Sequence, residues 1–335
     1  MSNKFLLVIS VGIVCCSCQQ GPLLEQSLVE YTKRMAKVLE VEPATLKSVS
    51  LPPFPTLTSM QQNIPATNIN LADFYQLKHC RIYSLVAERN TSLGRLQLPS
   101  TRYIYERQLL DMLKICLSQT SELILQDKLK YWLEIKTHQL PTVWANLIQT
   151  SSEIKYTLSS NSGLIEGDQQ DGLNQTSTAL RYLSELTPTT RLESATLEAH
   201  LKYLQNNPLP AKIWRSQLIL TEHLNQLTAW LNKYKHLLTC KNEKPSQQTT
   251  YLTNVFRLFF IKKIQSIAGQ LNYYHYQLSP ILNSFEEHPH LSPNFKQYIQ
   301  TQNKQGFERY SLAMQQHLAF WQMLFKRCNI APGQT

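Results

Sequence analysis

The chain has 335 residues, of which 42% are hydrophobic and 17% charged, so its length allows one large core or two smaller ones. Only nine glycines are present, a composition that excludes collagen-like chains and argues against global disorder. The net charge of +10 is uneven, because a basic region at 201–263 follows an acidic one at 151–200.

The first residues have the layout of a secretory signal peptide. Lys4 precedes an apolar run from Phe5 to Cys16, and small residues follow. The run is shorter than the ~20 apolar residues that a transmembrane helix needs. We therefore expect residues 1–17 to be an export signal that is removed.

The end of this run resembles the lipobox of bacterial lipoproteins, in which a small residue precedes a cysteine that receives diacylglycerol. Cys18 follows Ser17 and is the expected acceptor, although Cys15 stands where these motifs usually carry Leu. Cys16 is the alternative acceptor, and cleavage without lipidation would give a soluble secreted protein. Gln19 stands where lipoproteins of the inner membrane typically have Asp. The resemblance therefore implies acyl chains such as palmitate on Cys18 and anchoring at the periplasmic face of the outer membrane.

Export also decides how the basic region 201–263 is interpreted. In the cytoplasm a basic region with aromatic residues would favour nucleic-acid binding, but an exported protein does not meet nucleic acid. We therefore expect no nucleic-acid partner, and contact of this region with an envelope protein or with anionic lipid headgroups. A solvated helix face that keeps the protein soluble is the simpler alternative.

Four cysteines remain in the mature chain: Cys80, Cys116, Cys240 and Cys328. An even number in an exported protein indicates two disulfides, with buried free thiols as the alternative. Of the three possible connectivities, we favour Cys80 with Cys116, on two arms of a helical hairpin, and Cys240 with Cys328, near two late helix ends. No pair has the C-x-x-C spacing of a zinc or redox site, so we expect no metal and no cofactor.

Apolar residues recur with helical periodicity along the mature chain, so we predict an all-α fold, a multi-helix bundle with about eight or nine principal helices in one bundle or two sub-bundles. It should be roughly 60 to 75% helical, without a sheet of three strands. Pro141 is expected to begin a helix and Pro280 to follow the end of one. Capping residues, turns and these prolines predict helices that include 71–89, 100–116, 121–140, 141–158 and 249–278.

The expected segments differ in composition. They are a signal peptide at 1–17, a lipidated N-terminus with an amphipathic helix at 18–42, a Pro-rich linker at 43–68, a helical region with the Cys80–Cys116 hairpin at 69–165, and a helical bundle at 166–335. The Pro-rich segment cannot sustain a helix, so it is either a spacer or a strap across the body.

One polar cluster could carry chemistry. It consists of Glu88, Arg89, Asn90, Ser92 and Ser100, close to Tyr103 and Glu106. A hydrolase would use a buried Glu88 as general acid, with Arg89 and Asn90 orienting the substrate. In the simpler, structural interpretation Asn90 ends a helix and Arg89 pairs with Glu88 or Glu106.

Three parts of the chain form a recognisable pattern: Ala87–Gly94 with Pro99 and Ser100, the preceding Leu71–Phe74 and Cys80, and His317–Gln322 with Cys328. This pattern resembles a family of uncharacterised proteobacterial lipoproteins classed as a domain of unknown function. The resemblance covers most of the mature chain and implies lipidation, export and helical content. It brings no activity, substrate or catalytic residue. His317 itself lies on an apolar helix face, as expected for a core histidine.

The sequence carries no catalytic, metal or nucleotide motif that names an activity. We therefore expect a lipid-anchored envelope protein with a binding or scaffold role rather than an enzyme. The alternative is a hydrolase or transferase that acts on envelope glycan or lipid through the Glu88 region.

Overall fold

Helices make up 76% of the residues that the computed structural model describes, which are 23–45, 48–91, 98–167 and 172–331. Within these ranges the sheet has two short antiparallel strands, β1 (Cys240–Lys241) and β2 (Lys244–Pro245). The predicted all-α, multi-helix fold is therefore confirmed. The signal peptide and the predicted lipid acceptor Cys18 lie outside the described residues.

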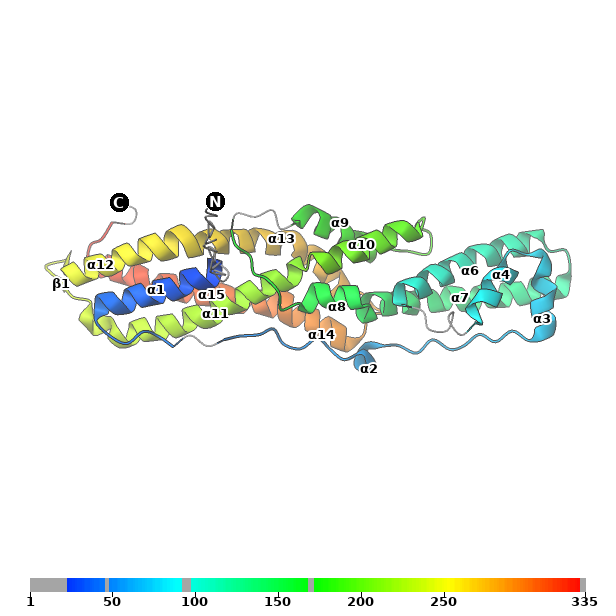
Figure 1. Ribbon diagram of the computed structural model, residues 1–335, viewed down its shortest axis with the longest axis horizontal. Helices are drawn as coiled ribbons and strands as arrows, with labels where there is room; N and C mark the ends of the chain where they lie inside the picture. The colour runs from blue at the N-terminus through cyan, green and yellow to red at the C-terminus, as the bar shows by residue number, and fades with distance from the viewer. Residues whose placement is uncertain (1–22, 46–47, 92–97, 168–171, 332–335) are drawn as a thin grey trace, which may run out of the picture.

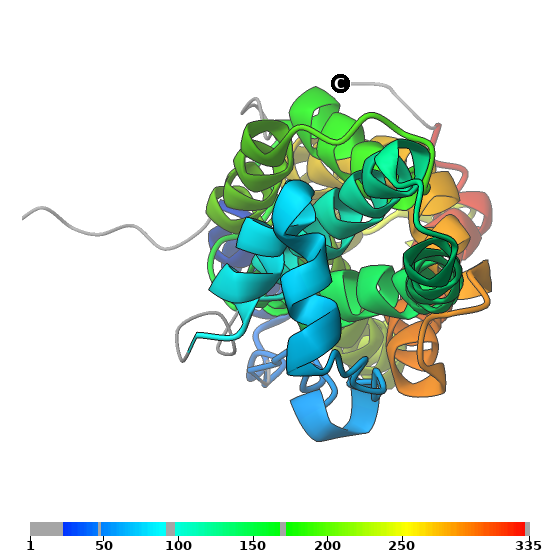
Figure 2. The same cartoon turned by 90° about the vertical axis from the view of Figure 1, so that its right-hand side faces the viewer.

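The molecule is elongated, with a large bundle at one end and a small lobe at the other (Figure 1). The large bundle contains α1 (Leu23–Leu39), α8 (Ser152–Ser159), α9 (Leu173–Ser184), α10 (Ser194–Asn206), α11 (Leu209–Tyr234), η2 (Lys235–Leu237), α12 (Gln247–Val255), η3 (Phe256–Ile264), α13 (Gln265–Glu287), α14 (Pro293–Gln300), η4 (Thr301–Gln305) and α15 (Gly306–Arg327). The small lobe contains α3 (Leu71–Gln76), η1 (Leu77–His79) and α4 (Ile82–Arg89), which lie in front of the other helices in Figure 2. Two long helices, α6 (Pro99–Gln119) and α7 (Leu123–Thr150), reach from the small lobe into the large bundle, and each part has its own cluster of buried apolar side chains.

The central helix of the large bundle is α11. Leu220, Leu224, Leu227 and Leu231 recur at steps of four and three, which places them on one face of this helix. Each is at most 1% exposed. α11 packs most extensively against α15 and also contacts α1 and α13, so this leucine seam forms the core of the bundle.

A buried histidine joins three helices of the large bundle. His317 of α15 is 0% exposed; the Tyr31 hydroxyl from α1 lies 3.0 Å from its Nε2, and the Thr228 hydroxyl from α11 lies 2.9 Å from its Nδ1. The Trp321 indole N–H donates to the same Nε2 at 3.2 Å. An indole nitrogen can only donate, so Nε2 is the unprotonated nitrogen and Nδ1 carries the proton. His317 is therefore a fully satisfied core histidine, as its sequence position predicts.

Both prolines that were expected to interrupt helices lie inside them, so those two boundaries are wrong. Pro141 lies within α7, and Pro280 lies within α13. Each costs a backbone hydrogen bond, but Leu140 and Val143 on one helix and Leu278 and Leu282 on the other are almost fully buried. Burial of these neighbours outweighs the lost bond. The break after α7 comes instead at Ser151, which has the extended ψ of 142°.

The helix expected at 71–89 is also interrupted, and here the sequence-based boundary is wrong for a different reason. Cys80 has extended backbone angles, φ −105° and ψ 142°, between η1 and α4. It forms a disulfide with Cys116 of α6, with a Cα–Cα distance of 5.4 Å. The chain therefore turns at Cys80, so that α4 packs against α6 as a separate helix.

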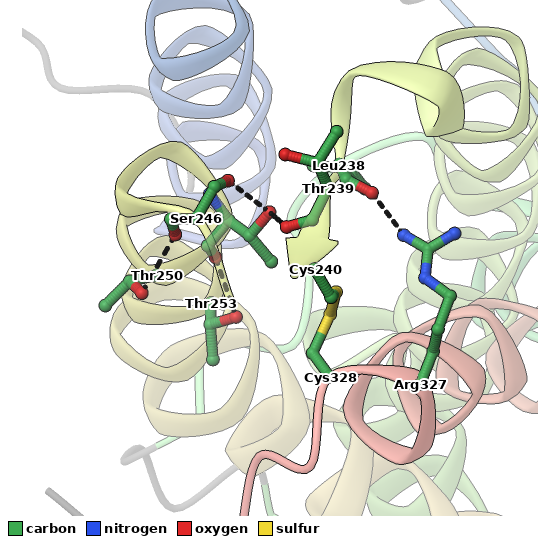
Figure 3. The surroundings of a disulfide bond; sticks show 9 residues. Leu238, Thr239, Cys240, Ser246, Thr250, Thr253, Arg327 and Cys328 are labelled. Carbon is green, nitrogen blue, oxygen red and sulfur yellow. Dashed lines mark hydrogen bonds between the residues drawn. A yellow bond between two sulfur atoms is a disulfide. The ribbon is translucent and has the colours of Figure 1, made fainter. Parts of the chain in front are cut away.

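The second disulfide joins β1 to the end of α15 (Figure 3). Cys240 pairs with Cys328, with a Cα–Cα distance of 5.4 Å. Beside it the Arg327 guanidinium donates to the Leu238 carbonyl, and the Ser246 backbone N–H donates to the Thr239 carbonyl at 3.0 Å. Both disulfides are the pairs that the helix pattern favours.

The Pro-rich segment runs along the molecule from the large bundle to the small lobe, and we call its described residues 48–69 the strap (Figure 1). The backbone of the strap forms few hydrogen bonds within the strap, and side-chain amides of α7 supply partners for it. The Asn146 amide exchanges two bonds of 2.9 Å with the backbone of Gln62, and Gln149 donates to the Met60 carbonyl at 2.6 Å. One short helix, α2 (Leu57–Met60), interrupts the strap, and Met60 is buried.

The disulfides give a first prediction. Replacing Cys80 and Cys116 by serine should lower the free energy of unfolding by about 4 kcal/mol in the entropic model, since their 36-residue separation no longer restricts the unfolded chain. Urea unfolding measures this loss, and amide exchange should accelerate in α4 but not in α11. Non-reducing peptide maps that link Cys80 to Cys240 or Cys328 would contradict the pairing.

The buried histidines predict a loss of stability in acid. Burial lowers the pKa of His317 to about 3 and that of His275 to about 4, from the ordinary 6.5. Below pH 6.5 the unfolded chain therefore binds more protons than the folded one. The free energy of unfolding should fall as the pH drops from about 6.5 towards 3, by up to about 1.4 kcal/mol per pH unit for each histidine.

Urea unfolding between about pH 4 and 7 measures this slope. His317→Gln should flatten it, while His236→Gln, which replaces an exposed histidine, should leave it as in the unchanged protein. A His317→Gln protein with the original slope would show that this imidazole is not a source of the acid sensitivity.

Candidate functional site

The five residues of the predicted polar cluster, at the end of α4 and the start of α6, do not come together in one site. Glu88 and Asn90 are exposed, Arg89 is half-buried and Ser100 is buried, whereas Ser92 lies outside the described residues. α4 turns Ile82 towards the small-lobe core and leaves Glu88 on its outer face. The expectation of a buried Glu88 acting as general acid is therefore wrong. Asn90 ends α4, as the structural interpretation predicts.

The buried carboxylate of this region is Glu106, one helix further along. It lies on α6 and is 1% exposed. Its Oε1 receives the Arg102 guanidinium from the same helix and lies 3.3 Å from Nζ of Lys136 on α7. Packing of α6 against α7 brings these groups together, because 30 residues separate Glu106 from Lys136 along the chain.

A pocket of about 320 Å³ opens beside this ion-pair group, between the strap, α4, α6 and α7. Its floor is apolar and is formed by Leu77, Ile82, Val86, Leu109, Leu113 and Trp132. Its polar lining residues are Thr67, Asn68, Arg89, Asn90, Arg102, Tyr105 and Lys136. An apolar floor with a few convergent polar groups is the usual composition of a small-molecule site.

The charged residues that line the pocket are all cations. Arg89, Arg102 and Lys136 line it, while Glu106 pairs with the last two from behind. The Tyr105 ring lies between two guanidinium groups, 5.8 Å from Cζ of Arg89 and 5.7 Å from Cζ of Arg102. The pocket therefore carries more positive than negative charge.

Burial and this charge imbalance shift two pKa values. Burial lowers the pKa of Lys136, and the nearby Arg102 and Arg89 lower it further, whereas Glu106 opposes the shift. Burial, with a smaller contribution from the Glu106 carboxylate, raises the pKa of Tyr105 to about 12. A second anion near Lys136 would therefore favour its charged form.

Several buried polar atoms around the pocket have no hydrogen-bond partner among the described residues. They include Nε of Arg102 and the hydroxyl of Thr67, both on lining residues, and Oε2 of Glu106. Buried donors without partners cost free energy, and most such groups in folded proteins are satisfied. A ligand that accepts hydrogen bonds would satisfy the Arg102 and Thr67 groups.

A second hollow of about 560 Å³ adjoins the pocket and shares Arg89 and Arg102 with it. It lies between the strap and α7, and Pro99 at the start of α6 lines it. The first turn of a helix carries partial positive charge from its unpaired N–H groups. The shared arginines therefore stand between the two hollows, and the second also borders the start of α6.

Sequence reasoning reached Arg89, Asn90 and Glu106 but missed Arg102 and Lys136. One signal could have found Lys136, because it interrupts an apolar stripe of α7. The stripe consists of Leu125, Leu129, Trp132, Lys136, Leu140 and Val143. A lysine in such a stripe is buried only with a partner, and the partner, Glu106, could not be identified before the packing was known.

Two further properties concern the described residues alone. No group of three or more histidine, cysteine, aspartate or glutamate side chains there could hold a metal ion. None of the helices in the described ranges combines the length and the hydropathy that a membrane span requires.

The ion-pair group gives a third prediction. Glu106→Gln leaves Lys136 and Arg102 without their counter-charge, and should lower the free energy of unfolding by about 2 to 4 kcal/mol. Adding Lys136→Met should recover part of this loss, giving a coupling energy of about 1 to 3 kcal/mol in a double-mutant cycle. The exposed pair Asp127 and Lys130, at 3.2 Å, is the control, with an expected coupling of about 0 to 1 kcal/mol. Equal coupling in both pairs would contradict the burial argument.

Comparison with known proteins identifies a family but no characterised relative. No curated protein and no solved structure matches the chain. A family described as "Protein of unknown function (DUF3080)" matches residues 28–332, which include nearly all of the described helices of both the large bundle and the small lobe. The resemblance to an uncharacterised domain family is thereby confirmed, and the chain belongs to the DUF3080 family.

Proposed function

We propose that this protein is a lipid-anchored, periplasm-facing envelope protein that binds a small ligand in the pocket of its small lobe. The observation that carries the binding role is the pocket itself, where an apolar floor meets Arg89, Arg102 and Lys136. The anchoring rests on the signal peptide and on the lipobox-like Cys18. The two disulfides are compatible with the oxidising periplasm that export implies.

The large bundle offers a surface that suits a membrane-anchored protein. Cys18 precedes α1 closely, and α1 packs against α12 and η3 of the basic region. Arg34 of α1 lies 5.8 Å and Lys263 of η3 lies 5.1 Å from the centre of the Phe259 ring. Leu258 and Ile261 of η3 are exposed apolar residues. Basic and apolar side chains together favour contact with anionic headgroups at an interface.

An enzyme acting through the Glu88 region is the weaker alternative. A general acid must be held near the reacting bond and is usually shielded from water. Glu88 is exposed and does not line the pocket. The buried carboxylate, Glu106, is occupied by Arg102 and Lys136. Ligand binding accounts for these positions without a chemical step.

The anchoring is tested by Cys18→Ala in cells fed a labelled fatty acid. We expect the unchanged protein to be acylated and to fractionate with the outer membrane. The variant should remain an uncleaved, unlabelled precursor, because the acceptor thiol is missing. Cys16→Ala is the matched control and should still be labelled; acylation that persists in Cys18→Ala and disappears in Cys16→Ala would show that the acceptor is Cys16.

A further inference from the structure

We propose that the pocket of the small lobe takes a single-chain anionic amphiphile, with its acyl chain on the apolar floor and its carboxylate or phosphate head between Arg89, Arg102 and Lys136. This ligand class rests on the proposed binding role of the pocket. The volume of the pocket, its apolar lining residues and its lining cations together indicate this class of ligand.

The floor explains why the ligand needs an apolar part. Leu77, Ile82, Leu109, Leu113 and Trp132 come from four elements, η1, α4, α6 and α7, and form the small-lobe core together with the disulfide cysteines. Ile69 and Val86 also line the pocket and are only partly buried, so a purely polar anion would leave them in contact with water, whereas an acyl chain would cover them. The floor therefore selects against free inorganic anions.

The volume of the pocket limits the ligand to one chain. Small-molecule sites commonly occupy about 300 to 1,000 Å³, and this pocket has about 320 Å³. A lipid with two long chains would not fit within it. A larger head could extend into the second hollow, which shares Arg89 and Arg102 with the pocket.

The lining cations explain why the head should be anionic. Arg89, Arg102 and Lys136 line the pocket from three helices, and among the described residues Glu106, which pairs with Arg102 and Lys136, does not line it. Arg102 Nε and the Thr67 hydroxyl belong to lining residues, are buried and have no partner among the described residues, so two donors beside the pocket are unsatisfied. Hydrogen bonds from charged donors to carboxylate or phosphate are among the strongest in proteins.

Photocrosslinking on the full, membrane-anchored chain in phosphatidylcholine nanodiscs tests this ligand class. The probes are dodecanoic acid and dodecylamine, each with the same diazirine at the end of its chain. The acid should label peptides that contain Ile82, Val86 or Leu109, while the amine, which differs only in the charge of its head, should not. Equal labelling by the amine would overturn the proposal, as would acid labelling confined to the large bundle.

Competition with unlabelled compounds separates the possible heads. If laurate alone displaces the probe, the natural head is a carboxylate. If dodecyl phosphate alone displaces it, the head is a phosphate. Displacement by both compounds would show that the pocket accepts either anionic head. Inorganic phosphate that competes as well as dodecyl phosphate would overturn the role of the chain. Failure of both amphiphiles to compete would overturn the proposal as well.

Two variants separate a binding defect from a folding defect. Arg102→Gln should weaken laurate competition about tenfold, because one charged hydrogen-bond donor is lost while Lys136 still pairs with Glu106. Glu106→Gln should strengthen competition several-fold although it destabilises the protein, because both cations are then available to the ligand. Arg215→Gln on α11 is the control and should change nothing. If Glu106→Gln weakens laurate competition as much as Arg102→Gln does, the group of Arg102, Glu106 and Lys136 supports the fold and does not bind the ligand.

The outcome is independent of the anchoring test. Loss of acylation in Cys18→Ala bears on location and leaves probe labelling of the pocket as it is. Absence of probe labelling in an acylated, correctly fractionated protein overturns the ligand class alone.

Discussion

The structure depends on the burial of a neutral imidazole among three helices. His317 holds α1 to α11 and α15 through Tyr31 and Thr228, and Trp321 donates to the nitrogen that a second proton would need. Burial lowers the pKa of His317 to about 3, so the contact is kept in its neutral form.

The two parts of the molecule handle polar groups differently. In the large bundle the His317 group is satisfied by neutral donors and acceptors, and the rings of Tyr31, Phe260 and Trp321 contact it. In the small lobe Glu106 is buried with charged partners, beside a pocket whose charged lining residues are all cations. Buried ion pairs contribute little net stability, whereas charges placed at a pocket can bind a ligand. The stability of the small lobe and the capacity of its pocket to bind an anion are therefore coupled through Glu106.

The strap connects these two parts and forms one wall of the pocket. Its prolines prevent any helix longer than the four residues of α2, yet its backbone groups still need partners when they lie against the body. Asn146 and Gln149 of α7 supply them at Gln62 and Met60, and Gln139 donates to the Pro65 carbonyl at 2.9 Å. The amides recur along one face of α7, so a single helix face holds an extended chain in place and positions Thr67 at the pocket.

Local information in the sequence determined the helical class, the leucine seam of α11, the core position of His317 and both cysteine pairs, because periodicity and helix ends are properties of neighbouring residues. Tertiary packing decided the rest. Pro141 and Pro280 lie within helices because burial of their neighbours outweighs one lost hydrogen bond, and Cys80 ends a helix because its chain must turn towards Cys116. The pocket joins Arg89, Arg102 and Lys136 from three helices; no local pattern shows which charged side chains will share a buried space, since that depends on contacts between segments far apart in the chain.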